Sequence, residues 1–220
     1  MKKICLFAIA LLVILTGCTN KNALDFKKEY EALNGKENAS GKVHRTISIS
    51  EDNPYEKVSS KMILELIDNK ETFYVYFGDE MCPWCRSVIE KSIEVAKKNN
   101  INKIYYVKIW DSEGNEVLRS KYKLNDSNEP ELVQKGTDDY YELLKKFDKV
   151  LADFTLSTKT GEKINVNEKR IYAPNFIYVE KGVPIKIVEG ISDKQKDSRE
   201  DLTKEILKDE EDLFNKFFKK

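Results

Sequence analysis

The sequence predicts an α/β domain with a central mixed β-sheet flanked by helices. Two buried-strand patterns, at 73–77 and 104–110, are separated by a helical pattern at 82–99. Two further β-rich runs, at 176–179 and 183–188, are joined by a short turn that contains a glycine, which is typical of a hairpin. Strands linked through a helix, with a hairpin added to them, indicate this fold class.

The length, net charge and cysteine count of the chain limit the kinds of protein it can be. The chain has 220 residues, with 38 Lys and Arg against 38 Asp and Glu, and 40% of its residues are apolar. This length fits one large or two small domains, at about 150 residues per domain. A nucleic-acid-binding protein normally carries a basic excess, so the zero net charge argues against a nucleic acid as partner. The four cysteines are too few for a disulfide-stapled miniprotein but suffice for one metal site or one redox pair.

The N-terminus resembles the signal peptide of a bacterial lipoprotein. Lys2 and Lys3 precede an apolar run at 4–15, which at about 1.5 Å per residue is too short for the roughly 30 Å hydrocarbon core. The Leu-Thr-Gly-Cys segment at 15–18 resembles a lipobox, which implies that Cys18 is diacylglycerylated and that residues 1–17 are removed as the signal peptide. The alternative is an ordinary signal peptide that is cleaved elsewhere.

A lipidated Cys18 would tether the mature chain to the extracytoplasmic face of the cell membrane, because two acyl chains hold a protein there stably. Cleavage would also remove Cys5 and two lysines. What remains is a mildly acidic chain whose only free thiols are those of Cys82 and Cys85.

Residues 18–41 are predicted as the lipidated cysteine followed by a polar linker, which contains Asn-Gly and Ser-Gly turn signals. Phe26 and Tyr30 are spaced to pack on the domain if this segment is helical. Residues 42–220 are predicted as one domain.

The remaining elements follow in order. An extended run at 45–50 and a helix at 55–68 precede the first buried strand, which Gly78 ends. An insertion at about 111–170 holds a polar loop, a helix that begins near Thr137, and a hairpin of 154–157 and 163–166. The last helix, at 198–218, is amphipathic. Its polar face mixes both charges, which favours packing on the sheet over lying on a membrane.

Cys82, Pro83, Trp84 and Cys85 form a Cys-x-x-Cys motif that follows a strand and opens a helix, which indicates a thiol redox motif. Zinc needs four ligands, and only His44, which we expect on the surface, is present upstream. A structural disulfide would close too small a loop to restrain the unfolded chain much. Copper delivery lacks a set of His or Met partners. We therefore expect no metal and no bound cofactor.

The position of each motif residue predicts its role. A helix N-terminus stabilises negative charge, so Cys82 is the predicted nucleophile. Pro83 fits the first helical turn, where its missing N–H costs nothing. Cys85, one turn further along on the buried face, would resolve the mixed disulfide. Trp84 is expected at the rim, as an apolar contact for a polypeptide. Three charged neighbours act on the thiolate, two against it and one in its favour: Asp79, Glu80 and Arg86.

With these residues, the chain resembles the thioredoxin superfamily over about 42–218. The matching features are the strand at 73–77, the Cys-Pro-Trp-Cys helix start, and Ala173-Pro174 directly before the hairpin of 175–188. The resemblance implies a thioredoxin-like fold, in which Pro174 is a cis proline facing the redox pair. It also implies that Ala173 supplies backbone hydrogen bonds to an extended substrate.

More narrowly, the motif region resembles small Gram-positive thioredoxin-like lipoproteins, some of them described as bacteriocin transport accessory proteins. Two features depart from thioredoxin itself. Tyr76 stands where thioredoxin has a buried acidic residue, and proline comes first in the dipeptide, as in glutaredoxins and periplasmic disulfide oxidases.

The sequence thus predicts a membrane-anchored thiol–disulfide oxidoreductase. It would act on cysteines of extracytoplasmic polypeptides and be reset by a membrane redox partner. Oxidase, isomerase and reductant share these residues and differ in potential and partner. The alternative is a non-catalytic accessory module that holds an exported peptide in its groove and whose cysteines are vestigial or structural.

Overall fold

The computed structural model describes residues 21–111 and 115–219. The predicted signal peptide with Cys5, and the predicted lipidation residue Cys18, lie outside the described residues. Within these ranges, none of the helices combines the length and the apolar character that crossing a membrane requires.

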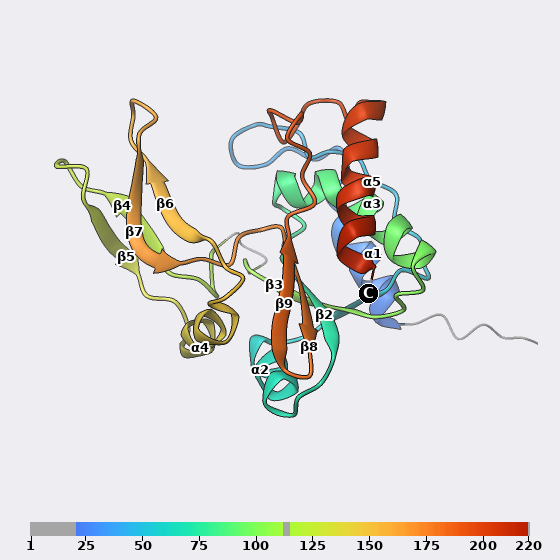
Figure 1. The fold of residues 1–220 in the computed structure, drawn as a ribbon. Helices are drawn as coiled ribbons and strands as arrows, with labels where there is room; N and C mark the ends of the chain where they lie inside the picture. The colour runs from blue at the N-terminus through green and yellow to red at the C-terminus, as the bar shows by residue number, and fades with distance from the viewer. Residues whose placement is uncertain (1–20, 112–114, 220) are drawn as a thin grey trace, which may run out of the picture.

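A mixed sheet forms the centre of the described chain (Figure 1). In the order in which they pair, its strands are β1 (Tyr55–Lys57), β3 (Ile104–Lys108), β2 (Phe73–Gly78), β8 (Asn175–Glu180) and β9 (Val183–Val188). β1 and β2 run parallel to β3, whereas β8 is antiparallel to β2 and β9 is antiparallel to β8. The α/β fold class with a mixed sheet is therefore confirmed.

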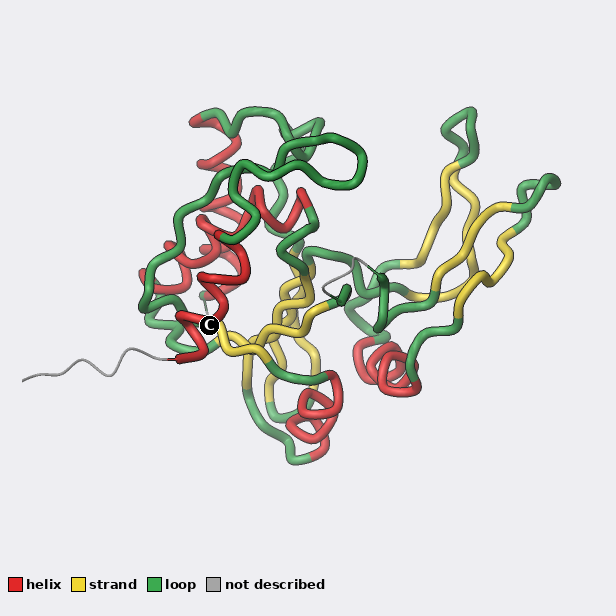
Figure 2. Tube along the Cα trace, turned by 180° about the vertical axis from the view of Figure 1, so that it is seen from behind, coloured by secondary structure: helices red, strands yellow, loops and turns green. Residues whose placement is uncertain are grey.

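Strand β2 is buried on both faces, because helices cover both sides of the sheet. Alternation along the strand sends Tyr74 and Tyr76 to one face and Val75 and Phe77 to the other. The helices on the Tyr76 face are α1 (Lys21–Glu31), α3 (Pro83–Lys98) and α5 (Lys204–Phe218) (Figures 1 and 2). Those on the Val75 face are α2 (Ser60–Asp68) and α4 (Asp138–Phe147).

Residues 21–31 of the predicted polar linker form a helix, so the prediction of a linker is wrong for this part. Helix α1 buries Ala23, Phe26 and Tyr30 in the same core that receives α3. The Phe26 ring stacks on Tyr55 with the ring centroids 4.3 Å apart. The segment is polar elsewhere because only this narrow stripe contacts the domain. The packing of Phe26 and Tyr30 on the domain, predicted for a helical segment, is confirmed.

The predicted insertion consists of α4, which packs on the Val75 face of the sheet, and two hairpins that form a lobe beside the sheet (Figure 1). Thr137 caps α4, and the second hairpin consists of β6 (Asp153–Ser157) and β7 (Lys163–Lys169), as the sequence predicts. The first hairpin, of β4 (Lys121–Leu124) and β5 (Pro130–Gln134), was not predicted. None of its residues is buried, and polar residues alternate irregularly with exposed apolar ones such as Leu132 and Val133, so no buried-strand pattern marks it.

Two predicted helices begin later than their apolar pattern suggests. The run predicted as one helix at 55–68 divides into β1 and α2, because the Ser59 hydroxyl caps α2 by accepting the N–H of Met62. In the same way, Thr203 caps α5, so the last helix starts at Lys204 rather than at 198.

Candidate redox site

The two cysteines of the motif lie at the N-terminus of α3. Cys82 is the N-cap, and its sulfur accepts the backbone N–H of Cys85 over 3.3 Å. Pro83 follows in the first turn, as predicted. Both thiols are free; Cys82 is 6% exposed, whereas Cys85 has no exposed surface. Cys82 is therefore the one that a second molecule can reach.

The surroundings push the pKa values of the two thiols apart. A hydrogen bond from the Cys85 side chain lowers the pKa of Cys82, with help from the N–H groups of Cys85 and Trp84. Burial and the Asp79 charge act against this effect. Burial holds the pKa of Cys85 well above its usual range. Cys82 is thus the more acidic of the two thiols, and Cys85 is the one that holds its proton.

The residues directly before β8 form the side of the site that faces Cys82. The Ala173–Pro174 peptide bond is cis, as the resemblance stated above implies, and Pro174 is buried. The Cys82 thiol donates to the carbonyl oxygen of Ala173 over 3.4 Å. Asn175 fixes the turn, because its side-chain oxygen accepts the N–H of Tyr172 over 2.7 Å.

A hollow of about 360 Å³ opens in front of Cys82. Its lining residues are Met81, Cys82, Pro83, Trp84, Trp110 and Ala173. The structure therefore gathers four of the predicted site residues in the hollow and places Cys85 and Pro174 behind it. Apart from the thiol its side chains are apolar, so the hollow suits an apolar side chain next to a reacting sulfur.

Trp110 and Met81 are lining residues that the sequence did not predict as site residues. Trp110 is the last residue of the strand predicted at 104–110, and no pattern in the sequence indicates that its side chain faces the motif. The main-chain N–H of Trp110 donates to the Asp79 carboxylate over 3.2 Å. The Arg119 guanidinium lies 5.3 Å from the centre of its ring, a cation–π contact that fixes the ring from the side of the lobe.

Two acidic residues, Asp79 and Glu80, flank the motif, as predicted, but the two carboxylates have different surroundings. Burial, followed by the nearby charge of Glu80, raises the pKa of Asp79 to about 7. The Asp79 carboxylate also accepts the N–H of Met81 over 2.8 Å, so it shapes the loop before Cys82. Glu80 forms an ion pair with Lys108 at 2.5 Å. Asp79 is therefore the acid that opposes the Cys82 thiolate.

Arg86 and His44 have surroundings that differ from those predicted. Arg86 has no exposed surface, and its guanidinium donates to main-chain oxygens of Tyr30, Arg45 and Glu80. These hydrogen bonds join α1 and the segment at Arg45 to α3. His44 is 6% exposed, so the prediction of a surface residue is wrong. The short bridge between Glu37 and Val43 folds this segment back, and burial lowers the His44 pKa.

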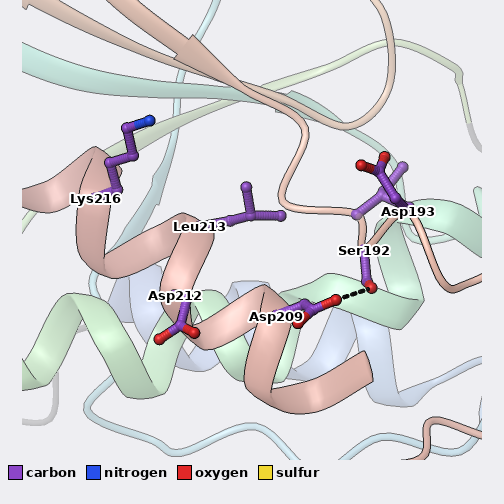
Figure 3. A pocket seen from close by; sticks show the side chains of 7 residues that line it. Ser192, Asp193, Asp209, Asp212, Leu213 and Lys216 are labelled. Carbon is purple, nitrogen blue, oxygen red and sulfur yellow. Dashed lines mark hydrogen bonds between the residues drawn. The ribbon is translucent and has the colours of Figure 1, made fainter. Parts of the chain in front are cut away.

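A second hollow lies between α5 and the loop after β9 (Figure 3). There the Asp209 carboxylate accepts the Ser192 hydroxyl over 2.9 Å and pairs with Lys194 at 3.1 Å. Because this charge is already neutralised, we place the candidate site at the start of α3. Within the described ranges, no group of three or more His, Cys, Asp or Glu side chains is arranged to hold a metal ion.

Comparison with known proteins does not identify a family for this chain. No protein-family model matches the chain, and a search of curated proteins finds no match either.

Proposed function

We propose that the chain has a thioredoxin-like fold and is a membrane-anchored, extracytoplasmic thiol–disulfide oxidoreductase that acts on cysteines of polypeptides. The observation that carries this proposal is the pair of unlike thiols at the start of α3, with Cys82 facing an apolar hollow and Cys85 buried behind it. The mixed sheet and the contact between the Cys82 thiol and the Ala173 carbonyl oxygen support it.

The chemistry takes two steps. The Cys82 thiolate attacks a substrate disulfide, so that one substrate sulfur joins Cys82 and the other leaves as a thiolate. Cys85 then gives its proton to the thiolate released in the first step and attacks the substrate-bound Cys82 sulfur, which breaks the mixed disulfide and releases the second substrate thiolate. The substrate disulfide is reduced and the Cys82–Cys85 pair is oxidised; the same steps in reverse oxidise a substrate dithiol. The membrane partner that resets the pair sets the direction.

The hollow and the cis segment define how a substrate would be held. An extended polypeptide that runs past Ala173 brings its sulfur next to Cys82, since the two groups are in contact. A neighbouring apolar side chain of the substrate then fits between Trp84 and Trp110. The substrate class is therefore a cysteine-containing segment with an apolar residue beside the cysteine.

A trapping experiment tests this function. The Cys85→Ser chain cannot resolve mixed disulfides, so adducts that depend on Cys82 should accumulate in cells and appear on non-reducing gels. The matched control is the double variant with Cys82→Ser, which should form none. If Cys85→Ser forms no more adducts than this control, the chain is instead a non-catalytic accessory module that holds a peptide in the same hollow.

A further inference from the structure

One arginine side chain joins two sides of the hollow in front of Cys82. Arg119 is 5% exposed, and its guanidinium lies 5.3 Å from the centre of the Trp110 ring. Its Nη1 atom also donates to the carbonyl oxygen of Ile171 over 3.0 Å. Ile171 lies two residues before Ala173, whose carbonyl oxygen contacts the Cys82 thiol. The same side chain thus contacts the Trp110 side of the hollow and the chain that leads to Ala173.

Arg119 is oriented by a carboxylate that lies between two arginines. The Oε1 atom of Glu116 accepts Nε of Arg119 and lies 3.2 Å from Nη2 of Arg170. Nη1 of Arg170 donates to the carbonyl oxygen of Ser120 over 2.9 Å, and its guanidinium lies 4.1 Å from the centre of the Phe154 ring. Both arginines are buried. A buried charge is costly unless it is paired and hydrogen-bonded, so these partners restrict the Arg119 guanidinium to one position.

The shape of a guanidinium suits these contacts. The group is planar, carries N–H donors in a fixed arrangement along its edge, and is attracted to the face of an aromatic ring. In Arg119 the Nε and Nη1 donors are used by Glu116 and Ile171. The Trp110 ring lies within cation–π distance of the same group. A lysine ammonium is a compact point charge, which cannot hold these three partners in the same arrangement.

Strand pairing does not link the two sides of the hollow directly. Trp110 follows β3 and Ala173 precedes β8, and β2 lies between these two strands in the sheet. The main chain of Trp110 instead pairs with Glu116 in a short antiparallel bridge. Glu116 in turn accepts the Arg119 side chain that reaches the carbonyl oxygen of Ile171. The contacts of Arg119 therefore act on the width of the hollow between Trp110 and Ala173, which both line it.

We propose that Arg119 is a positioning residue that determines substrate specificity: by holding the Trp110 ring and the Ile171 carbonyl group together, it keeps the hollow at a width that accepts an apolar side chain next to the substrate cysteine. This inference rests on the proposed exchange function and adds to it a residue that acts through its neighbours. It also connects the lobe to the redox site, because Arg119 lies in the segment that joins β3 to β4.

The first measurement reports the surroundings of the Trp110 ring without any reaction. The chain has two tryptophans, so Trp110 is the only one left after Trp84→Phe. All variants are made in the full chain with Cys5→Ser and Cys18→Ser, which is purified in detergent. Arg119→Met removes the guanidinium and keeps an unbranched side chain. It should raise the constant for acrylamide quenching of Trp110 fluorescence by about twofold, since the ring loses its contact with the guanidinium and becomes more accessible.

The second measurement compares two peptide disulfides that differ in one residue. Each is the symmetric disulfide of a short peptide, with either leucine or glycine beside its cysteine. Chromatography of acid-quenched samples measures the peptide thiol that the reduced protein releases. In the chain that keeps Trp84, Arg119→Met should slow exchange with the leucine peptide by about three- to tenfold, because the leucine side chain loses a hollow of fitting width. Exchange with the glycine peptide, which places no side chain there, should stay within about twofold.

Arg170→Met is the matched control. Arg170 is also buried and also pairs with Glu116, but the ring in contact with its guanidinium is that of Phe154. Its replacement removes the same charge from the same carboxylate while the contacts of Arg119 with the hollow remain. It should therefore leave the quenching constant and the ratio of the two exchange rates unchanged.

The results that overturn the inference are distinguishable from those that overturn its premise. An unchanged quenching constant in Arg119→Met refutes the hold on Trp110. An unchanged ratio of the two exchange rates, or the same changes in Arg170→Met, refutes the role of Arg119 in specificity. No exchange with either peptide in the parent chain refutes the exchange function itself, and the quenching result still decides whether Arg119 positions the ring. If thermal unfolding shows that Arg119→Met does not fold, Arg119→Lys, which keeps the charge but not the planar group, must show the same rise in quenching and the same selective loss.

Discussion

The sulfur of Cys82 lies 3.4 Å from the carbonyl oxygen of Ala173, which is 91 residues further along the chain. Antiparallel pairing of β2 with β8 creates this contact, because Phe77 pairs with Asn175 near the ends of the two strands. Ala173 precedes β8 and Cys82 follows β2, so this pairing places both residues at the same end of the sheet, next to the start of α3. The register of the two strands thus determines whether a substrate held at Ala173 can meet the nucleophile.

Replacing the buried acid beside the motif should make Cys82 more acidic. Asp79 raises the pKa of Cys82, and its own pKa lies at about 7, so its charge grows over the pH range in which Cys82 is titrated. Asp79→Asn removes that charge and should lower the apparent pKa of Cys82 by about 0.5 to 1 unit. The rate of iodoacetamide alkylation against pH measures it. Glu94→Gln, on a later turn of α3, serves as the control and should not move the midpoint. An unchanged midpoint in Asp79→Asn contradicts the prediction.

Removing one aromatic wall of the hollow should affect peptides more than small disulfides. Trp110 lines the hollow together with Trp84, and the Arg119 guanidinium contacts its ring. Trp110→Ala should slow exchange with a peptide disulfide flanked by apolar residues by roughly tenfold, since about 1.4 kcal/mol of apolar contact is lost. Exchange with oxidised glutathione should stay within about twofold. Leu132→Ala, at an exposed position of the lobe, is the control. Equal slowing with both substrates would show that Trp110 does not select the peptide.

The features predicted correctly from the sequence are those whose signal is local. The strand at 73–77 is a continuous apolar run, and the start of α3 is marked by a cysteine N-cap and Pro83. Helix α1 buries only three of its eleven residues. So few apolar positions also occur in solvated segments, and the sequence alone therefore does not show that α1 packs on the domain. Trp110 enters the hollow through tertiary contacts with Asp79 and Arg119, which no spacing in the sequence encodes.

The membrane anchor makes a prediction of its own. If Cys18 is lipidated, only Thr19 and Asn20 separate it from the first residue of α1, so the domain would lie directly at the membrane surface. Globomycin, which blocks the lipoprotein signal peptidase, should make an unprocessed precursor accumulate. Cys18→Ala should abolish incorporation of a labelled fatty acid, whereas Cys5→Ala should not. Unchanged mobility under globomycin would contradict lipoprotein processing.

A buried carboxyl group in α5 should make the stability of the protein fall as the pH rises. Glu210 has no exposed surface, and within the described part of the chain its two oxygens have no hydrogen-bond partner. Burial raises its pKa from 4.5 to about 8, although Lys91 and Arg45 partly oppose the shift. Between these two pH values the unfolded state binds fewer protons than the folded state, so the free energy of unfolding decreases with pH and levels off above about pH 8.

Glu210→Gln removes this titration while keeping the shape of the side chain. It should therefore raise the free energy of unfolding by on the order of 2 kcal/mol at pH 8 and by much less at pH 5. Urea unfolding at the two pH values measures the difference. Glu205→Gln, an exposed position in the first turn of the same helix, should change the free energy by less than about 0.5 kcal/mol at either pH. A gain for Glu210→Gln that is the same at both pH values would show that packing, and not ionisation, limits the stability of α5 at this position.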